Sequence, residues 1–551
     1  MAGTEIDLGY LPNSTSPIYD QNYQGGDRNS SGITQIENYR KVIDAELIYP
    51  RPDSETPTWA RHRKAYTGRK YEFAIGVANG AWPFYYEVIS GPSGLTVGTG
   101  LNVDGNGALT PAANYGVVSW DSPTAGTHSV TVRVSFQDGA TAIDVVWEIV
   151  VGTSGHIFVD ASVGSSGTGT LASPFKNIDD WYLADSTDTT YSEFHVHYAA
   201  GTYDVFTSDA TNNNNIVLDY HNKPLVHIGE VGESVIWDFD TGNLVTGIEP
   251  EFNGLEQNFH DFYCGDIEWT GGKQEDGARR LAVFATARGD FPYDPDGSIG
   301  GCRNTWFRSN QTSWTYTGDA SNNAGICFAS NAGDVDKGRS HWYISHLDIS
   351  DITNGHTNFN GWFIGQMRRF LVEHITESNT DFGRGPFSGK SSEWGSCYRN
   401  LDLVAAPDQS FVYDNAGSYA PLVGGNTEVS YSRFKRISGS GNDAVIESGH
   451  HNNIYSAGNP YHDPNYHFRN NISGVGGSAA AFNAFFDWPV FVYDDIWCSN
   501  TTDGISFDGP VNTQVDGGWL LFTTANNPFD ADLNLLSDTN RGTLGAEMVE
   551  A

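Results

Sequence analysis

The sequence predicts an all-β protein in two parts, a sandwich of antiparallel strands followed by a solenoid of short repeated strands. Three observations predict it. The chain is rich in Gly (63), Phe (30), Tyr (27) and Trp (15), and only 18% of it is charged, which suits strands joined by many turns. Apolar and polar residues alternate in residues 130–151, as on half-buried strands. In the second half, a short apolar strand motif returns at intervals of about one solenoid coil.

Length and charge limit the domain count and the partners. A chain of 551 residues is too long for one core, so two or more domains are expected. Its 30 Lys and Arg against 67 Asp and Glu give a formal charge of −37, which repels phosphate backbones. Nucleic acid is therefore not expected as a partner. A polyanionic sugar also needs a local cluster of Arg and Lys to bind such a chain.

The cysteines and the hydropathy exclude other classes. The five Cys are scattered, odd in number and never in a CxxC pair, so we expect small buried residues rather than a zinc site or a disulfide framework: Cys264, Cys302, Cys327, Cys397 and Cys498. No stretch reaches the roughly 18 apolar residues of a membrane span, and residues 1–7 do not read as a signal peptide.

Residues 1–61 are polar and show no sustained periodicity. We expect them to form an arm that orders only against a neighbour or a partner, which makes them a candidate for attachment.

Residues 62–153 predict the sandwich. Val130, Val132 and Val134 alternate with polar residues, Asp138-Gly139 reads as a turn, and the apolar residues of 143–151 return on one face as the second strand of a hairpin. With the stretches 83–88, 91–97 and 115–120, this block resembles the cadherin-like and other Ig-like domains of surface proteins.

A different type of sequence follows the linker at residues 152–155. His156–Asp160, the glycines after it and residues 172–178 are followed by Phe194–Tyr198 and Ala200–Tyr203. These stretches resemble the opening elements of pectin-lyase-like proteins. The resemblance implies a right-handed parallel β-helix over residues 156–510, with a closing coil and tail over 511–551.

The later repeats fit such a solenoid. Six apolar residues are predicted to be equivalent from coil to coil: Leu347, Ile375, Leu401, Phe434, Ile472 and Ile496. The coils differ in length, which indicates loops of different size on one side. Asn and Asp near the strand ends suit tight corners, because Asn tolerates the left-handed conformation and its amide can stack between coils.

Two regions carry candidate catalytic groups. The proteins that the chain resembles cleave uronic-acid polymers by β-elimination or hydrolyse glycosides with paired carboxylates. A lyase needs a cation and a base, and a hydrolase needs two carboxylates. The first region, around Glu377, offers Asp381, Arg384 and Lys390 as catalytic candidates and Trp394 as a sugar-binding candidate. The alternative for this region is a solvated loop with weak ion pairs.

The second region is rich in groups that accept a proton or pack on a sugar ring. Glu447 and His450 are its catalytic candidates, and Tyr455, Tyr461 and Tyr466 its carbohydrate-binding candidates. Packing and turn roles are the alternative. No HExxH or other regular ligand spacing supports a metal here.

No cofactor is expected. Asp294, Asp296 and Gly297 imitate the start of a calcium loop, but Thr305 stands where an EF-hand has Glu, so an EF-hand is excluded. Calcium on oxygen-rich turns of this acidic chain is left open.

Three functions remain. We expect a virion surface protein of the tailspike or fibre kind, which binds host polysaccharide, with depolymerisation left open, and which attaches to other virion proteins through the arm. The first alternative is a secreted bacterial polysaccharide lyase or glycoside hydrolase. The second alternative is a non-enzymatic structural or adhesive surface protein. The virion interpretation is preferred because no signal peptide is apparent. A homotrimer is an open alternative to a single chain.

Overall fold

The computed structural model describes separate stretches of the chain. They are 45–54, 58, 60–80, 82–103, 109–136, 142–178, 180, 194–204, 225–238, 254–256, 263–270, 280–286, 305–308, 312–315, 324–330, 339–353, 360–365, 367–378, 385–390, 397–405, 412–414, 426–430, 432–436, 446–448, 465–469, 472–475, 482–484, 490–493, 495–498, 505–507, 515–516 and 519–522. The elements of these stretches are strands and one short 3-10 helix, Arg61–Arg63, so the described chain is all-β, as the sequence predicts. No helix within these stretches is long and apolar enough to cross a membrane.

Residues 46–152 form what we call the N-terminal module, built of small sheets. Its strands are β1 (Glu46–Tyr49), β2 (Lys64–Tyr66), β3 (Tyr71–Ala74), β4 (Gly76–Ala78), β5 (Tyr85–Ser90), β6 (Leu95–Val97), β7 (Leu101–Val103), β8 (Leu109–Pro111), β9 (Val117–Trp120), β10 (Gly126–Ser135) and β11 (Ile143–Gly152). Among the described residues they pair in the orders β2-β11-β10-β5, β3-β9-β6, β1-β4 and β7-β8. The pairs are antiparallel except β2 with β11. Strand β1 lies within the predicted arm, and it pairs with β4.

The predicted hairpin is confirmed. Val130 pairs with Trp147, Val132 with Val145 and Val134 with Ile143 on β10 and β11. All but Ile143 of these side chains are buried, while the alternate positions face outward, because successive side chains on a strand point to opposite faces. The turn at Asp138-Gly139 lies outside the described residues.

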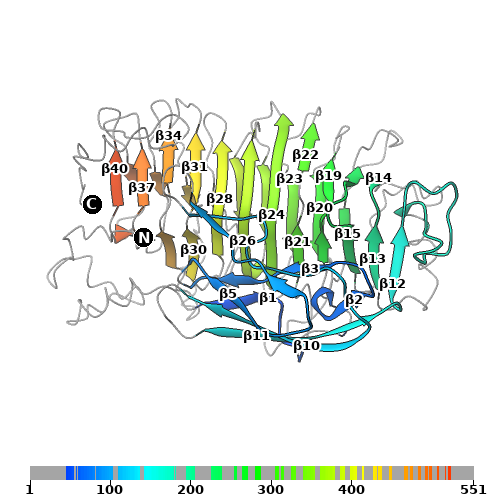
Figure 1. Ribbon diagram of the computed structural model, residues 1–551. Coiled ribbons are helices and arrows are strands. Elements are labelled where there is room, and N and C mark those ends of the chain that lie inside the picture. The colour runs from blue at the N-terminus through cyan, green and yellow to red at the C-terminus, as the bar shows by residue number, and fades with distance from the viewer. Residues whose placement is uncertain are drawn as a thin grey trace, which may run out of the picture.

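The rest of the described chain is dominated by parallel strands. One sheet contains β12 (His156–Val159), β13 (Phe194–Tyr198), β14 (Gly201–Asp204), β15 (Leu225–Gly229), β16 (Val235–Asp238), β18 (Tyr263–Gly265), β19 (Glu268–Thr270), β21 (Thr305–Arg308), β22 (Thr312–Thr315), β24 (Arg339–Thr353), β26 (Met367–Ser378), β28 (Cys397–Ala405), β30 (Asn426–Ser430), β31 (Arg433–Arg436), β33 (Asn465–Arg469), β34 (Ile472–Val475), β36 (Val490–Tyr493), β37 (Asp495–Cys498), β39 (Val515–Asp516) and β40 (Trp519–Phe522). We call it the long sheet. Figure 1 shows its strands arrayed from β12 at one end to β40 at the other, and some successive strands, such as β30 and β31, both pair with the same long strand, β28.

A second parallel sheet stacks seven strands within the described residues. They are β17 (Gly254–Glu256), β20 (Arg280–Thr286), β23 (Ala324–Ser330), β25 (Asn360–Gly365), β27 (Gly385–Lys390), β29 (Val412–Asp414) and β32 (Ile446–Ser448). We call it the seven-stranded sheet. Strands β35 (Phe482–Ala484) and β38 (Ile505–Phe507) form a further parallel pair.

Left-handed residues form corners at matching places of the long sheet. His346, His374 and Asn400 have φ of 55°, 57° and 55°, and each precedes one of the register partners Leu347, Ile375 and Leu401. The rings of His346 and His374 lie 4.7 Å apart. The corner at Asn400 agrees with the predicted role of Asn, whereas His at two such corners was not foreseen.

The predicted equivalence of the repeats is right for some coils and wrong for others. Leu347 pairs with Ile375, Ile375 with Leu401, and Ile472 with Ile496. Phe434, however, pairs with Leu403 rather than Leu401, and Ile472 pairs with Arg433 rather than Phe434. The connections between coils differ in length. The spacing of apolar residues along the chain therefore does not show a shift of one or two residues in the register of neighbouring strands.

The N-terminal module packs against one face of the long sheet. Strands β1, β3, β5, β10 and β11 lie along the side of the row of parallel strands in Figure 1. The buried core of the module runs on into the sheet, where it includes Val226, Ile228, Tyr343, Leu371 and Cys397. Burial of Cys397 agrees with the sequence-based expectation for the cysteines. Apolar burial is the main driving force of such packing, so the module and this part of the sheet share one core.

Candidate functional site

Most of the predicted site residues fall outside the described residues. These are Asp381, Arg384, Trp394, His450, Tyr455 and Tyr461. The calcium-loop imitation at Asp294, Asp296 and Gly297 also lies outside. Lys390, Glu447 and Tyr466 lie on described strands.

The structure brings Lys390 and Glu447 to one sheet and places Tyr466 on another. Lys390 ends β27 and Glu447 lies on β32, with only β29 between these strands of the seven-stranded sheet. Tyr466 belongs to β33 of the long sheet. The sequence groups Glu447 with Tyr466 and separates both from Lys390, so the strand order regroups the candidates.

The register assigns Lys390 and Glu447 to the same face. Ser388 pairs with Tyr413, and Tyr413 pairs with Glu447. Lys390 is two residues beyond Ser388, and positions two apart on a strand share a face. Phe363 pairs with Ser388 on the other side. We call this set, Phe363, Ser388, Lys390, Tyr413 and Glu447, the Lys390 face.

The alternate positions of the same strands are different in character. They include the apolar residues Trp362, Ile364, Phe387, Val412 and Ile446, and also Asn360, Asp414 and Ser448. Apolar positions of one parity are typical of the core side of a strand. The positions of the Lys390 face thus carry a lysine, a glutamate, a serine and two aromatic residues at one parity of four neighbouring strands.

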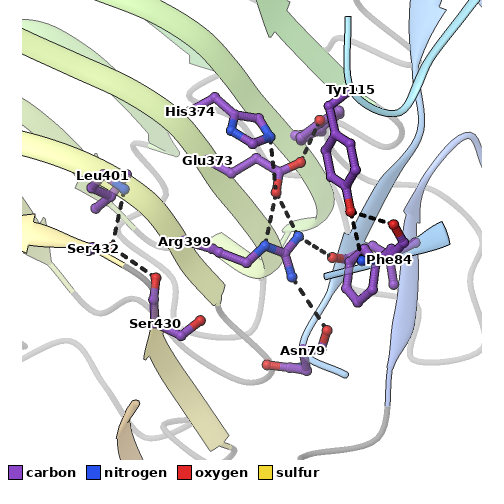
Figure 2. A network of polar contacts seen from close by, with 11 residues as sticks. Asn79, Phe84, Tyr115, Glu373, His374, Arg399, Leu401, Ser430 and Ser432 are labelled. Atoms are coloured by element: carbon purple, nitrogen blue, oxygen red, sulfur yellow. Dashed lines mark hydrogen bonds and ion pairs between the residues drawn. The ribbon is translucent and has the colours of Figure 1, made fainter. Parts of the chain in front are cut away.

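A buried polar network joins the module to the long sheet (Figure 2). Arg399 on β28 donates hydrogen bonds from Nε and Nη2 to Glu373 Oε2 at 3.0 and 2.6 Å. Its Nη2 also donates to the carbonyl oxygen of Val77 at 2.8 Å, and its guanidinium lies 4.6 Å from the ring centroid of Phe84. Tyr343 donates to Glu373 Oε1 at 2.7 Å.

The charges of this network are settled by its geometry. Burial alone would raise the pKa of the Glu373 carboxyl, but the Arg399 guanidinium, His374 and the hydrogen bond from Tyr343 together hold that pKa below its usual value. Burial and then the neighbouring Glu373 raise the pKa of the Tyr343 hydroxyl well above its usual range. Glu373 is thus ionised and Tyr343 neutral, so the network is a fixed structural joint and supplies no proton at neutral pH.

Tyr115 closes the module side of the joint. Its hydroxyl donates to the carbonyl oxygen of Phe84 at 2.6 Å and accepts from the backbone N–H of Phe84 at 2.7 Å. Its ring also lies edge-on to His374, with centroids 6.3 Å apart (Figure 2).

Three histidines gather at the start of the long sheet, and sequence reasoning missed them as a site. His156 on β12 pairs with His195 on β13, and His197 is two residues further along β13. One ligand nitrogen of each lies within 4.8 Å of the others. The signal was present as His-x-His in Phe194–Tyr198, because alternate residues of a strand share a face.

Two of these imidazoles are neutral. Burial lowers the pKa of His156 to about 3, assisted by Lys64 and Arg61 and opposed by the carbonyl of Ala65. Burial, together with His156, Arg61 and Arg69, lowers the pKa of His197 well below its usual value. Both rings therefore keep a nitrogen lone pair at neutral pH.

Comparisons of the chain with protein-family models, with curated proteins and with solved structures found no match, so the assignment of function rests on the geometry above.

Proposed function

We propose that this chain is a virion surface protein of the tailspike or fibre kind that binds host polysaccharide on a right-handed parallel β-helix. In this proposal the N-terminal module is an Ig-like sandwich that packs against the side of the helix. The polar residues near the N-terminus attach the protein to other virion proteins. The Lys390 face is the polysaccharide site.

The strand pairing supports the β-helix part of the proposal. Two long parallel sheets run through the same stretch of chain, and strands of the seven-stranded sheet alternate in sequence with strands of the long sheet. Left-handed corners recur at matching positions of successive coils. This is the pattern expected of a solenoid in which each coil contributes one or two strands to the long sheet and one to the seven-stranded sheet.

The single observation that carries the polysaccharide site is the register of the Lys390 face. Phe363, Ser388, Lys390, Tyr413 and Glu447 share one face across four neighbouring strands. Strands in a sheet are about 4.8 Å apart, so this row is about 14 Å long, enough for several sugar units. Aromatic residues pack on sugar rings, and Lys390 places one cation in this row on an otherwise acidic chain.

The module supports this choice of face. It occupies one side of the long sheet through Tyr343, Leu371 and Cys397, which are buried in the shared core. A polymer cannot reach those positions. The seven-stranded sheet therefore offers the better surface for an extended glycan.

Depolymerisation is the catalytic extension of the same proposal. A lyase requires a cation beside the substrate carboxylate and a base that removes the neighbouring proton. On the Lys390 face, Lys390 is the candidate cation and Glu447 is the candidate base.

A panel of purified uronate-containing and neutral polysaccharides tests the proposal. Binding is measured by calorimetry, and unsaturated products by ultraviolet absorbance, with reducing ends assayed in parallel. The proposal expects binding of at least one acidic polysaccharide. A rise in absorbance identifies a lyase, and reducing ends without absorbance identify a hydrolase. Failure to bind any member of a panel drawn from host surface glycans contradicts the proposal.

A further inference from the structure

The histidine cluster at the start of the long sheet has the geometry of an ion site. Nδ1 of His156 and Nε2 of His197 are 2.8 Å apart. His195 is fully buried, and a ligand nitrogen of its ring lies within 4.8 Å of the other two. His156 and His195 are register partners on β12 and β13, and His197 pairs with Phe158 on the same two strands, so the sheet itself holds their backbones in place.

Aromatic side chains enclose the cluster. The ring of Phe158 stacks on His197 with centroids 4.9 Å apart. Tyr66, from β2 of the module, lies edge-on to His156 at 5.2 Å and to His197 at 6.4 Å. An apolar shell of this kind keeps water from competing for the imidazole nitrogens.

We propose that His156, His195 and His197 form a binding site for a divalent transition-metal ion, of which Zn²⁺ is the best match. Three imidazoles are a familiar zinc ligand set, and they leave a fourth coordination position open. Ligand nitrogens about 2.0–2.1 Å from a tetrahedral ion are about 3.3 Å from one another. To reach this arrangement, the rings must rotate so that the 2.8 Å pair opens and the third ring draws in.

Nearby positive charges disfavour a bound cation, so we expect metal affinity to require all three imidazole ligands. Arg61, Lys64 and Arg69 lie close enough to influence the imidazoles, and they oppose a bound cation. Arg69 is partly compensated by Glu230, whose Oε1 is 2.8 Å from its Nη1. An all-imidazole ligand set selects ions such as Zn²⁺, Ni²⁺ and Cu²⁺ over hard, oxygen-seeking ions such as Mg²⁺ and Ca²⁺.

Metal binding also couples the module to the sheet. Tyr66 belongs to the module, while its ring contacts belong to β12 and β13. An ion that fixes His156 and His197 fixes the surface on which Tyr66 packs. Bound metal is thus expected to raise the melting temperature of the whole chain, because a ligand of the folded state stabilises it.

The test uses full-length protein without a histidine tag, stripped of metal with a chelator. Calorimetric titration with Zn²⁺ is expected to give one ion per chain. Co²⁺ is expected to give the visible absorption of a tetrahedral site. His156→Asn and His197→Gln are each expected to weaken Zn²⁺ binding at least tenfold. His128→Asn, which alters a histidine of the module outside the cluster, is the matched control and keeps the parental affinity.

Three results overturn the proposal: no Zn²⁺ binding by the parent, equal affinity in the parent and both cluster variants, or equal losses in the cluster and control variants. Any of these results would mean that His156 and His197 only share a hydrogen bond and do not bind a metal ion. X-ray absorption of the Zn²⁺-loaded parent needs no variant and covers the case of poor folding. Three imidazole ligands support the site, and fewer than three contradict it.

Discussion

Arg399 of the long sheet donates a hydrogen bond of 2.8 Å to the carbonyl oxygen of Val77, a residue 322 positions earlier in the chain. The same guanidinium holds the Glu373 carboxylate. A single side chain therefore satisfies a buried charge of the sheet and a backbone group of the module at once. This contact makes the two parts one structural unit.

Replacing Arg399 by Met is expected to destabilise the protein strongly. Glu373 would remain buried without its partner, and loss of one member of a buried pair costs about 3–5 kcal/mol. Denaturant unfolding measures the change. The double variant Arg399→Met/Glu373→Gln is expected to recover part of the loss. Arg133→Ala, which breaks an exposed pair with Asp144, is the control and should change stability little. Equal effects of Arg399→Met and Arg133→Ala would contradict the buried joint.

Gly76→Ala probes the close approach of module and sheet. A Cβ at Gly76 would lie 2.9 Å from the Tyr343 ring, closer than side chains tolerate. We expect a loss of about 1–3 kcal/mol in the free energy of unfolding, as for other overpacked cores. Gly152→Ala is the matched control, since a Cβ there meets nothing within 4 Å. A Gly76→Ala protein as stable as the control would mean that the module does not pack on Tyr343.

Alkylation of Cys397 reports on docking directly. Its side chain is fully buried in the core shared with the module, so its thiol should resist iodoacetamide in the native protein and react after denaturation. Mass spectrometry of the Cys397 peptide measures this. In Arg399→Met the thiol is expected to react faster. Rapid modification in the native parent would show that this part of the sheet is open.

Acid is expected to destabilise the protein through buried neutral histidines. Burial, with help from Arg63 and Arg61, lowers the pKa of His62 to about 3, and burial lowers that of His227 to about 3. Their unfolded pKa is about 6.5, so the unfolded chain binds more protons between these values. Stability therefore falls as pH drops from about 6.5 towards 3, by up to about 1.4 kcal/mol per pH unit for each group.

His62→Phe tests this pH dependence. Neither ring nitrogen of His62 has a hydrogen-bond partner, and Tyr49 and Phe73 surround the ring. Phe is expected to fit there and to make the melting temperature less sensitive to acid. Thermal melts at pH 7 and pH 5 measure the difference. Parallel pH profiles of variant and parent would rule out His62 as a contributor.

The sequence was sufficient for elements whose pattern is local. Alternation from Val130 to Val151 predicts the hairpin and its buried face; the register confirms the hairpin, and the burial of alternate residues confirms the face. The left-handed corner at Asn400 follows from the tolerance of Asn for that conformation.

The sequence did not predict contacts between residues that are far apart in the chain. Nothing near Val77 or Arg399 indicates that they meet, because each reads as an ordinary strand position. The register of Phe434 was wrong by two residues for a similar reason, since loop length hides the start of the next coil. Lys390 and Glu447 reach one face only through the strand order of the seven-stranded sheet, which no local pattern specifies.

The most direct test of the central claim is the affinity of the polysaccharide identified in the panel for variants of the Lys390 face. Tyr413→Ala and Lys390→Ala are each expected to weaken binding at least tenfold, about 1.4 kcal/mol. Tyr85→Ala removes an aromatic side chain that is 52% exposed on β5 of the module, and it should bind like the parent. Equal affinity in all four proteins, or a loss confined to Tyr85→Ala, would place the glycan elsewhere and contradict the account.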